Sequence, residues 1–312
     1  MRLDIAAQTD IGRRKKKNED SCGVFRDDTP GLRFFEEGAL LCVADGLGGH
    51  LGGEIASKLA VSHVKDLLKE DPPPMPNGVD DVDARAVGPL KAIRTSILRA
   101  NDSIYRDNLA HGLVANGTAM GTTMLAVLIE PGQAYVGNVG DSRCYLIRDG
   151  EIVGHTEDHS WVDEQVKLGL MSKAEAAVDR RKNVVTRCVG THPETEVDTY
   201  RWALSPGDLL LLCTDGLVNM VTDDDIKRIL RKNGTAAEMA QALVSLANEN
   251  GGKDNITVII ANISPSLVRL FLLRLRAFLR DHGITIGWYL LGLLYSMGLF
   301  AAGYLFRLYS TR

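Results

Sequence analysis

Four aspartates share one local pattern: each lies at the end of a predicted buried strand, with glycine adjacent or nearby. They are Asp45, Asp141, Asp215 and Asp254. Glycine lets the backbone approach a ligand closely. An aspartate where a buried strand meets solvent can hold a hard cation through oxygen, and the carbonyl of Gly46 can add a second ligand. A single Asp-Gly pair is more typical of an ordinary turn, but the repetition of the pattern favours a metal site.

Two more acidic residues, Glu19 and Asp20, follow a run of five cations at residues 13–17. The run can be read as a solvated surface. It can equally draw a phosphate group toward nearby carboxylates. Local sequence alone leaves both readings open.

A cluster of these carboxylates would repel itself and raise its own pKa values unless cations neutralised it. Oxygen ligands without cysteine or histidine select Mg²⁺ or Mn²⁺ over zinc. Two such ions about 3.5–4 Å apart can activate a shared water and stabilise displacement at phosphorus. The acidic residues therefore favour a site for two hard cations that could support displacement at phosphorus.

The acidic residues lie at the ends of predicted strands, so the strands determine whether they can come together. Apolar runs predict strands at residues 39–43, 122–129, 133–138, 143–148, 209–213 and 256–261, with shorter strands at 3–7 and 23–25. Helical spacing of Ile55, Leu59, Val64 and Leu68 predicts a helix after the glycine-rich stretch 46–53. Further helices are expected at 90–105, 161–168, 172–179 and 236–248, and a proline-rich loop at 71–89. Strands that group with their hairpins favour a layered α+β domain.

The formal net charge of −4 argues against general nucleic-acid binding, and the 45% hydrophobic content is ordinary for a globular core. The five scattered cysteines predict free thiols rather than a disulfide framework.

Residues 284–306 carry no charge across 23 positions, a length that would cross a bilayer core as a helix. More arginines precede this stretch than follow it, which predicts a cytoplasmic N-terminal part by the positive-inside rule. Residues 264–283 alternate apolar side chains with Arg269, Arg274, Arg276 and Arg280, as in a basic amphipathic helix at a membrane surface.

The motifs together resemble a known family. They are Asn18-Glu19-Asp20, Ala44-Asp45-Gly46-Leu47-Gly48-Gly49-His50, Gly121-Thr122-Thr123, Gly140-Asp141-Ser142-Arg143, Asp158-His159-Ser160, Thr214-Asp215-Gly216 and Lys253-Asp254-Asn255. In this order and spacing they resemble the metal-dependent protein phosphatases of the 2C type, and more narrowly the bacterial serine/threonine phosphatases.

The resemblance implies a four-layer α/β/β/α sandwich, two antiparallel sheets flanked by helices, followed here by a C-terminal transmembrane helix. It implies two Mn²⁺ or Mg²⁺ ions and a third, weaker one. Asp20, Asp45, Asp215, Asp254 and the Gly46 carbonyl would be ligands, Asp141 would help Asp215 hold the third ion, and Glu19 would act through water. The domains would be a phosphatase domain at 1–263 with a flap at 158–183, a juxtamembrane segment at 264–283, a transmembrane helix at 284–306 and a tail at 307–312.

This chain departs from the family at three points. Lys15 stands where the family has a phosphate-binding arginine. We therefore expect Lys15 to contact the phosphate through its ammonium group, without the two parallel hydrogen bonds that an arginine side chain can form. Leu47 stands where eukaryotic members place a histidine, and Asp179-Arg180 replaces a His-Pro pair in the flap. His50 and His159 are nearby, and for both a structural role is favoured over a catalytic one.

We therefore expect a protein serine/threonine phosphatase on the cytoplasmic face of the inner (plasma) membrane of a bacterium, attached by a single span. Its partners would be phosphorylated proteins, substrates of a serine/threonine kinase, and the membrane, but no nucleic acid. The alternatives are a membrane-bound pseudophosphatase that binds phosphoproteins, and a phosphatase for small phosphorylated molecules.

Overall fold

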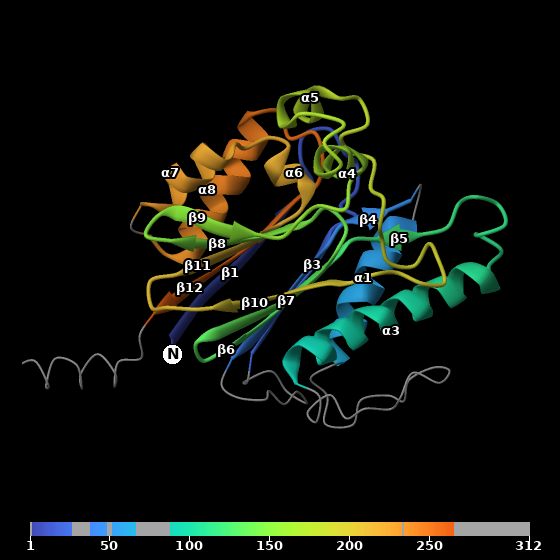
Figure 1. Ribbon diagram of the computed structural model, residues 1–312, viewed down its shortest axis with the longest axis horizontal. Helices are drawn as coiled ribbons and strands as arrows, with labels where there is room; N and C mark the ends of the chain where they lie inside the picture. Colours follow the sequence, from blue (N-terminus) through green and yellow to red (C-terminus); the bar gives the residue numbers. More distant parts are fainter. Residues whose placement is uncertain (1, 27–37, 49–51, 67–87, 233, 265–312) are drawn as a thin grey trace, which may run out of the picture. The chain divides into compact units, whose positions relative to one another are not determined.

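The computed structural model describes residues 2–26, 38–48, 52–66, 88–232 and 234–264. Two five-stranded sheets form the centre of this part of the chain (Figure 1). The first sheet has the order β1 (Arg2–Asp10), β12 (Ile256–Ser264), β11 (Leu209–Cys213), β8 (Arg143–Arg148) and β9 (Glu151–His155). The second has the order β10 (Asp198–Ala203), β7 (Gln133–Val139), β6 (Met124–Glu130), β3 (Ala39–Ala44) and β2 (Ser21–Arg26).

Helices cover the outer face of each sheet (Figure 1). The second sheet packs against α1 (Gly52–Lys65) and α3 (Pro89–Ala110), and the first against α6 (Asp215–Val218), α7 (Asp223–Leu230) and α8 (Ala236–Glu249). A two-stranded sheet joins β4 (Gly46–Leu47) to β5 (Gly121–Thr122). The flap contains α4 (Trp161–Lys167) and α5 (Lys173–Val178).

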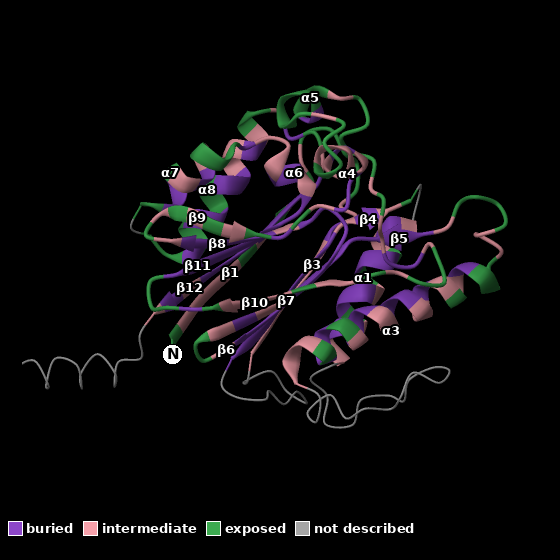
Figure 2. Ribbon diagram, in the orientation of Figure 1, coloured by how far each residue is buried: buried purple, intermediate pink, exposed green. Residues whose placement is uncertain are grey.

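Three apolar cores hold these layers together, because most central strands are buried on both faces (Figure 2). In β3, Leu40 and Cys42 face the helices, whereas Leu41 and Val43 face the other sheet. The alternation follows from the two-residue period of a strand. Uninterrupted apolar runs such as residues 209–212 therefore mark strands in the middle of the sandwich.

The predicted α/β/β/α sandwich is confirmed, and so are the expected strands and the two flap helices. One detail of the first helix is wrong: Ile55 is 46% exposed, and the buried face of α1 is formed instead by residues such as Ala56, Ala60 and Val64. β10, α6 and α7 were not predicted. All five cysteines are free, as expected.

The membrane-spanning prediction at 284–306 lies outside the described residues, as do His50 and residues 71–87 of the loop predicted at 71–89. That loop ends earlier than predicted, because α3 begins at Pro89. Within the described ranges, no helix has both the length and the apolar character needed to cross a bilayer.

Candidate active site at one edge of the sandwich

The predicted acidic residues lie at the ends of strands from both sheets. Asp20 precedes β2 and Asp45 follows β3 in one sheet, while Asp215 follows β11 and Asp254 precedes β12 in the other. Asp141 lies in the turn from β7 to β8, which crosses between the sheets. Chain segments far apart in sequence thus bring these residues to the same edge of the sandwich.

The pKa values show that these carboxylates interact. Burial is the main reason that the pKa of Asp45 lies well above its ordinary value, and the charges of Asp20, Asp215, Asp141 and Asp254 add to the effect. Burial, followed by the charges of Asp215 and Asp158, raises the pKa of Asp141 to about 8. Burial also raises the pKa of Asp215, together with the charge of Asp254. A cation would relieve both the loss of water and the mutual repulsion.

Asp20 is held from one side by two threonine hydroxyls. Thr214 Oγ1 donates to Asp20 Oδ2 at 3.0 Å and Thr257 Oγ1 donates to the same oxygen at 2.7 Å. These bonds lower the pKa of Asp20, but burial outweighs them and raises it to about 7, with help from the charges of Asp215 and Asp254. The two hydrogen bonds therefore fix the orientation of the carboxylate, while its other oxygen, Oδ1, has no hydrogen-bond partner.

Within the acidic cluster, two buried carboxylate oxygens have no hydrogen-bond partner, Oδ1 of Asp20 and Oδ1 of Asp215. Buried polar atoms are almost always satisfied, so an exception in an acidic cluster fits a cation. The donor set is all oxygen, which suits Mn²⁺ and Mg²⁺. As the side chains stand, no three histidine, cysteine or acidic residues within the described ranges already form a metal-binding group. The residues present nevertheless fit divalent ions in chemistry and location.

Asp45 and Gly46 are fixed through their backbone. The carbonyl of Asp45 accepts hydrogen bonds from Thr122 Oγ1 and from the Thr123 amide, and the Asp45 amide donates to Thr123 Oγ1 at 2.8 Å. A Cβ at Gly46 would overlap the backbone carbonyls of Gly53 and Glu19. Glycine is required there because the start of α1 passes directly over this backbone.

Lys15 lies at the same edge and binds the carboxylate of Asp254, with 2.5 Å between Lys15 Nζ and Asp254 Oδ1. Burial alone would lower the pKa of Lys15, but the hydrogen bond and charge of Asp254, with the charges of Asp45 and Glu19, raise it. The cationic loop is fastened here by Asn255, whose side-chain amide donates to the carbonyls of Ile11 and Lys17. The loop of five cations therefore approaches the acidic cluster and is more than a solvated surface.

Glu19 is held nearby through its backbone: its amide donates to Asn255 Oδ1 at 2.8 Å, and its carbonyl accepts from Ser57 Oγ at 2.7 Å. Its carboxylate lies close to the start of α1, since a Cβ at Gly53 would come within 3.1 Å of Glu19 Oε1. Every acidic residue predicted for the site is thus at this edge or directly beside it.

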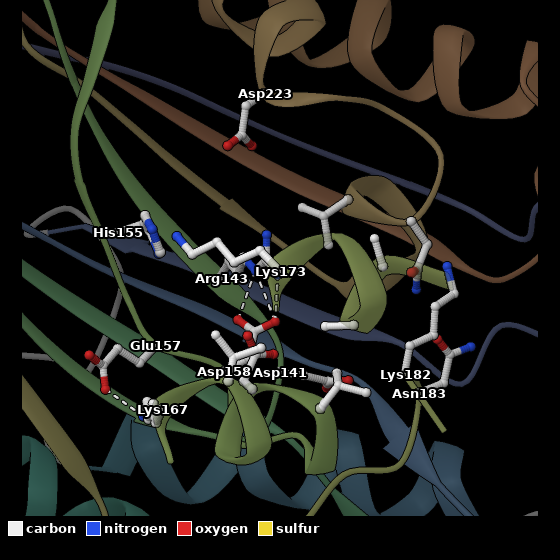
Figure 3. Close-up of a pocket in the computed structure, with 17 residues that line it drawn as sticks. Asp141, Arg143, His155, Glu157, Asp158, Lys167, Lys173, Lys182, Asn183 and Asp223 are labelled. Atoms are coloured by element: carbon white, nitrogen blue, oxygen red, sulfur yellow. Dashed lines mark hydrogen bonds and ion pairs between the residues drawn. The ribbon is translucent and has the colours of Figure 1, made fainter. Parts of the chain in front are cut away.

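A cavity of about 510 Å³ extends from Asp141 between the flap and α6 (Figure 3). Arg143 and Asp158 form a bidentate ion pair in it, with Nε–Oδ1 and Nη2–Oδ2 distances of 2.7 Å. Arg143 also donates to the Tyr145 hydroxyl at 3.1 Å. The pair joins β8 to the beginning of the flap, so the cavity has one fixed wall and one wall made of the flap.

Sequence reasoning missed the residues that orient the carboxylates. Thr214 and Thr257 bind Asp20, and Asn219 Nδ2 donates to Asp215 Oδ2 at 3.0 Å. Thr214 is visible in the Thr-Asp-Gly motif, and Asn219 lies four residues after Asp215 on the same helical turn. Thr257 has no signal of its own, because it binds Asp20 across 237 residues of sequence.

Comparison with known proteins agrees with this geometry. The family described as protein phosphatase 2C matches residues 16–257. The serine/threonine phosphatase stp of Listeria monocytogenes is 35% identical over 258 residues, covering 81% of this chain and 93% of its own. The S. agalactiae serine/threonine phosphatase has a TM-score of 0.71 and 33% identity, covering 84% of this chain and 100% of its own.

A further solved structure is the catalytic domain of the serine/threonine protein phosphatase PstP in complex with two manganese ions. It has a TM-score of 0.66 and 30% identity, covering 84% of this chain and 99% of the PstP domain. The shared sandwich, the acidic edge and these similarities lead to one conclusion: the chain belongs to the protein phosphatase 2C family of serine/threonine phosphatases, in its bacterial branch.

Proposed function

We propose that the chain hydrolyses phosphoserine and phosphothreonine in proteins at the acidic edge, using two Mn²⁺ or Mg²⁺ ions, while residues 284–306 tether it to the cytoplasmic face of the inner membrane. The observation that carries the catalytic part is the convergence of five aspartates on one edge, with buried oxygens of Asp20 and Asp215 lacking partners. The manganese ions of the related PstP domain support the choice of ion.

In this proposal, Asp20, Asp45, Asp215, Asp254 and the carbonyl of Gly46 would hold the two ions, and Asp141 with Asp215 a weaker third. When bound, such ions would lower the pKa of a water and neutralise phosphate charge. Glu19 would orient a water at the edge of the site, and Asn219 would keep Asp215 in position. Thr214 and Thr257 would keep Asp20 in position.

Lys15 would contact the substrate phosphate. Its ammonium group is already at the site, although it cannot bind a phosphate through two parallel hydrogen bonds as arginine does. We expect it to attract and orient the phosphate group as a point charge, which is enough for binding but less selective in geometry.

The catalytic proposal is tested with the full chain and a phosphothreonine peptide, with Mn²⁺, with a chelator, and as Asp215→Asn. We expect metal-dependent hydrolysis that the substitution lowers by at least about 100-fold, as loss of a transition-state charge stabiliser typically does. Asp208→Asn is the control, because Asp208 is buried at the opposite end of β11. No hydrolysis with any metal, together with retained phosphopeptide binding, would favour a scaffold instead.

The substrate class needs a separate comparison. We expect phosphopeptides to be turned over faster than sugar phosphates at equal concentration, because the 510 Å³ cavity beside Asp141 gives room for residues that flank the phosphate. Equal or faster turnover of the sugar phosphates would favour a small-molecule phosphatase.

The membrane tether is supported by the 23 uncharged positions of residues 284–306 and the arginines before them. Flotation of the full chain with lipid vesicles, compared with a chain that ends at residue 283, tests it. We expect only the full chain to float after a high-salt wash. Equal flotation of both would place the membrane contact elsewhere.

A further inference from the structure

The two ends of the flap meet in a short neck directly beside the acidic edge. The Trp161 amide donates to the Val184 carbonyl and the Thr186 amide to the His159 carbonyl, both at 2.8 Å, and Ser160 pairs with Val185 in an isolated bridge. The chain between these residues, which includes α4 and α5, leaves and re-enters the sandwich at this neck (Figure 1).

His159 occupies the neck and is completely buried. Its backbone amide donates to the Gly140 carbonyl at 3.0 Å, and its ring Nδ1 accepts from the Gly140 amide at 3.0 Å. One residue of the flap neck therefore clamps both polar groups of Gly140, which directly precedes Asp141.

The other ring nitrogen of His159, Nε2, points to β10. His159 Nε2 lies 3.2 Å from Asp198 Oδ2, close but not aligned as a hydrogen bond, and Asp198 also binds Arg187 at 2.9 Å. Since Nδ1 accepts a hydrogen bond, the ring proton belongs on Nε2, toward the Asp198 carboxylate. Burial lowers the pKa of His159 despite this carboxylate, which keeps Nδ1 available as an acceptor near neutral pH.

Gly140 has little freedom to compensate. Its φ is +110°, and a Cβ at this position would collide with Thr123. Thr123 in turn bonds the Ser142 hydroxyl at 2.8 Å and the Asp45 amide at 2.8 Å. The turn 140–142 is thus held from one side by the strand end that carries Asp45 and from the other by His159.

We propose that His159 is a positioning residue that couples the flap neck to the turn carrying Asp141, so that the acceptor at Nδ1 controls both flap order and the affinity of the ion that Asp141 holds. The inference rests on the proposed function, because the metal role of Asp141 is part of it. His159 itself touches neither substrate nor ion; it acts through Gly140.

The coupling is reciprocal by thermodynamic necessity. An ion that orders the turn 140–142 strengthens the contact with His159 and thereby orders the neck. A substrate segment that orders the flap strengthens the same contact from the other side and tightens the ion. The flap cavity and the weakest metal site are therefore expected to respond to each other.

Three substitutions of His159 distinguish the role of Nδ1 as a hydrogen-bond acceptor from the role of the ring in filling space in the core. In His159→Asn the side-chain oxygen can take the place of Nδ1, since both are bonded to Cγ. In His159→Gln the oxygen lies one atom farther out, near the place of Nε2, and in His159→Leu there is no acceptor. The matched control is Asp208→Asn, because buried Asp208 also accepts a backbone hydrogen bond, from the Ser205 amide at 2.7 Å, and it pairs with Arg148 far from this edge.

Two readouts are measured on the full chain: Mn²⁺ binding by calorimetry, and hydrogen exchange of the Trp161 and Thr186 amides without metal. We expect His159→Leu and His159→Gln to weaken the weakest Mn²⁺ site by about tenfold, in the range known for residues that orient metal ligands. The same variants should speed exchange of both neck amides, whereas His159→Asn stays within about twofold of the wild type. Should His159→Leu fail to fold, the contrast between asparagine and glutamine decides.

Unchanged Mn²⁺ affinity and neck exchange in the glutamine and leucine variants would overturn the proposal. So would an asparagine variant as defective as glutamine, or equal losses in Asp208→Asn, since either would mean general destabilisation. A wild-type chain that binds no Mn²⁺ would instead refute the proposed function, and the metal-free exchange data would still report on the neck.

Discussion

Lys15 is the residue at which we expect the most consequential departure from the family pattern. Lys15→Ala should lower kcat/KM for a phosphopeptide by about 10- to 100-fold, because the proposed charge-assisted contact to phosphate would be lost. Lys15→Arg should recover the wild-type value or exceed it, because the guanidinium can bind two phosphate oxygens at once. Steady-state kinetics at saturating Mn²⁺ measure both.

The control for Lys15 is Lys253→Ala, which removes an exposed cation next to Asp254 in the sequence, whereas the ion pair with the Asp254 carboxylate is made by Lys15. We expect it to change kcat/KM by less than about twofold, as expected for an exposed charge. A Lys15→Ala enzyme as active as the wild type would show that Lys15 only neutralises Asp254, to which it is already bound.

Residue types in the motifs were sufficient to predict where the acidic site forms, because Asp45, Asp141, Asp215 and Asp254 each lie at the end of a mostly buried strand. They were insufficient to predict how the site is held. His159 illustrates the limit: its partners Gly140 and Asp198 are 19 and 39 residues away in sequence. A histidine that accepts one backbone hydrogen bond has no local signature.

Among the elements, the close approach of α1 to β4 constrains the backbone at the site. Gly46→Ala should lower the free energy of unfolding by about 1–3 kcal/mol, the usual cost of forcing an extra group into a packed site, because the new Cβ would overlap the Gly53 and Glu19 carbonyls. Backbone on both sides cannot rotate away as a flexible side chain could. Denaturant unfolding measures the change.

Gly154→Ala in β9 is the matched control for Gly46→Ala, because a Cβ there meets nothing within 4 Å. We expect it to change the unfolding free energy by less than about 0.5 kcal/mol, as exposed substitutions usually do. If both variants were equally stable, the close approach of α1 to Gly46 would be relaxed in solution.

Element by element, the sequence predicted long apolar strands better than short amphipathic ones. β3 and β11 are buried on both faces and stand out as apolar runs. β10 reads Asp-Thr-Tyr-Arg-Trp-Ala, half-buried on alternate residues, and its pairing with β7 decides its state more than its own composition does. In α1 the small residues Ala56 and Ala60 face the sheet because the helix packs closely, which left the larger Ile55 outside.

At the scale of the whole molecule, the acidic edge should make the metal-free protein less stable as the pH rises. The carboxyl groups of Asp20 and Asp141 have pKa values raised by burial and by neighbouring charges to about 7 and about 8, against 3.8 for an ordinary aspartate. Between these values the folded state binds more protons than the unfolded state, so the free energy of unfolding falls as the pH rises from about 4 to about 8.

This pH dependence can be measured by thermal unfolding in chelator at pH 5 and pH 8, with Asp20→Asn as the reference because asparagine can still accept from Thr214 and Thr257. Relative to the variant, the wild type should lose on the order of 1–3 kcal/mol of stability over this range, or roughly 3 to 10 °C in Tm. Added Mn²⁺ should raise the wild-type Tm more at pH 8 than at pH 5, because protons compete with the ion for the same oxygens.

A wild type and an Asp20→Asn variant with parallel pH profiles would mean that these carboxylates stay ionised in the metal-free fold. The charges would then be balanced from within the chain, with Lys15 bound to Asp254 as the first candidate, and Lys15→Ala should restore the missing pH dependence.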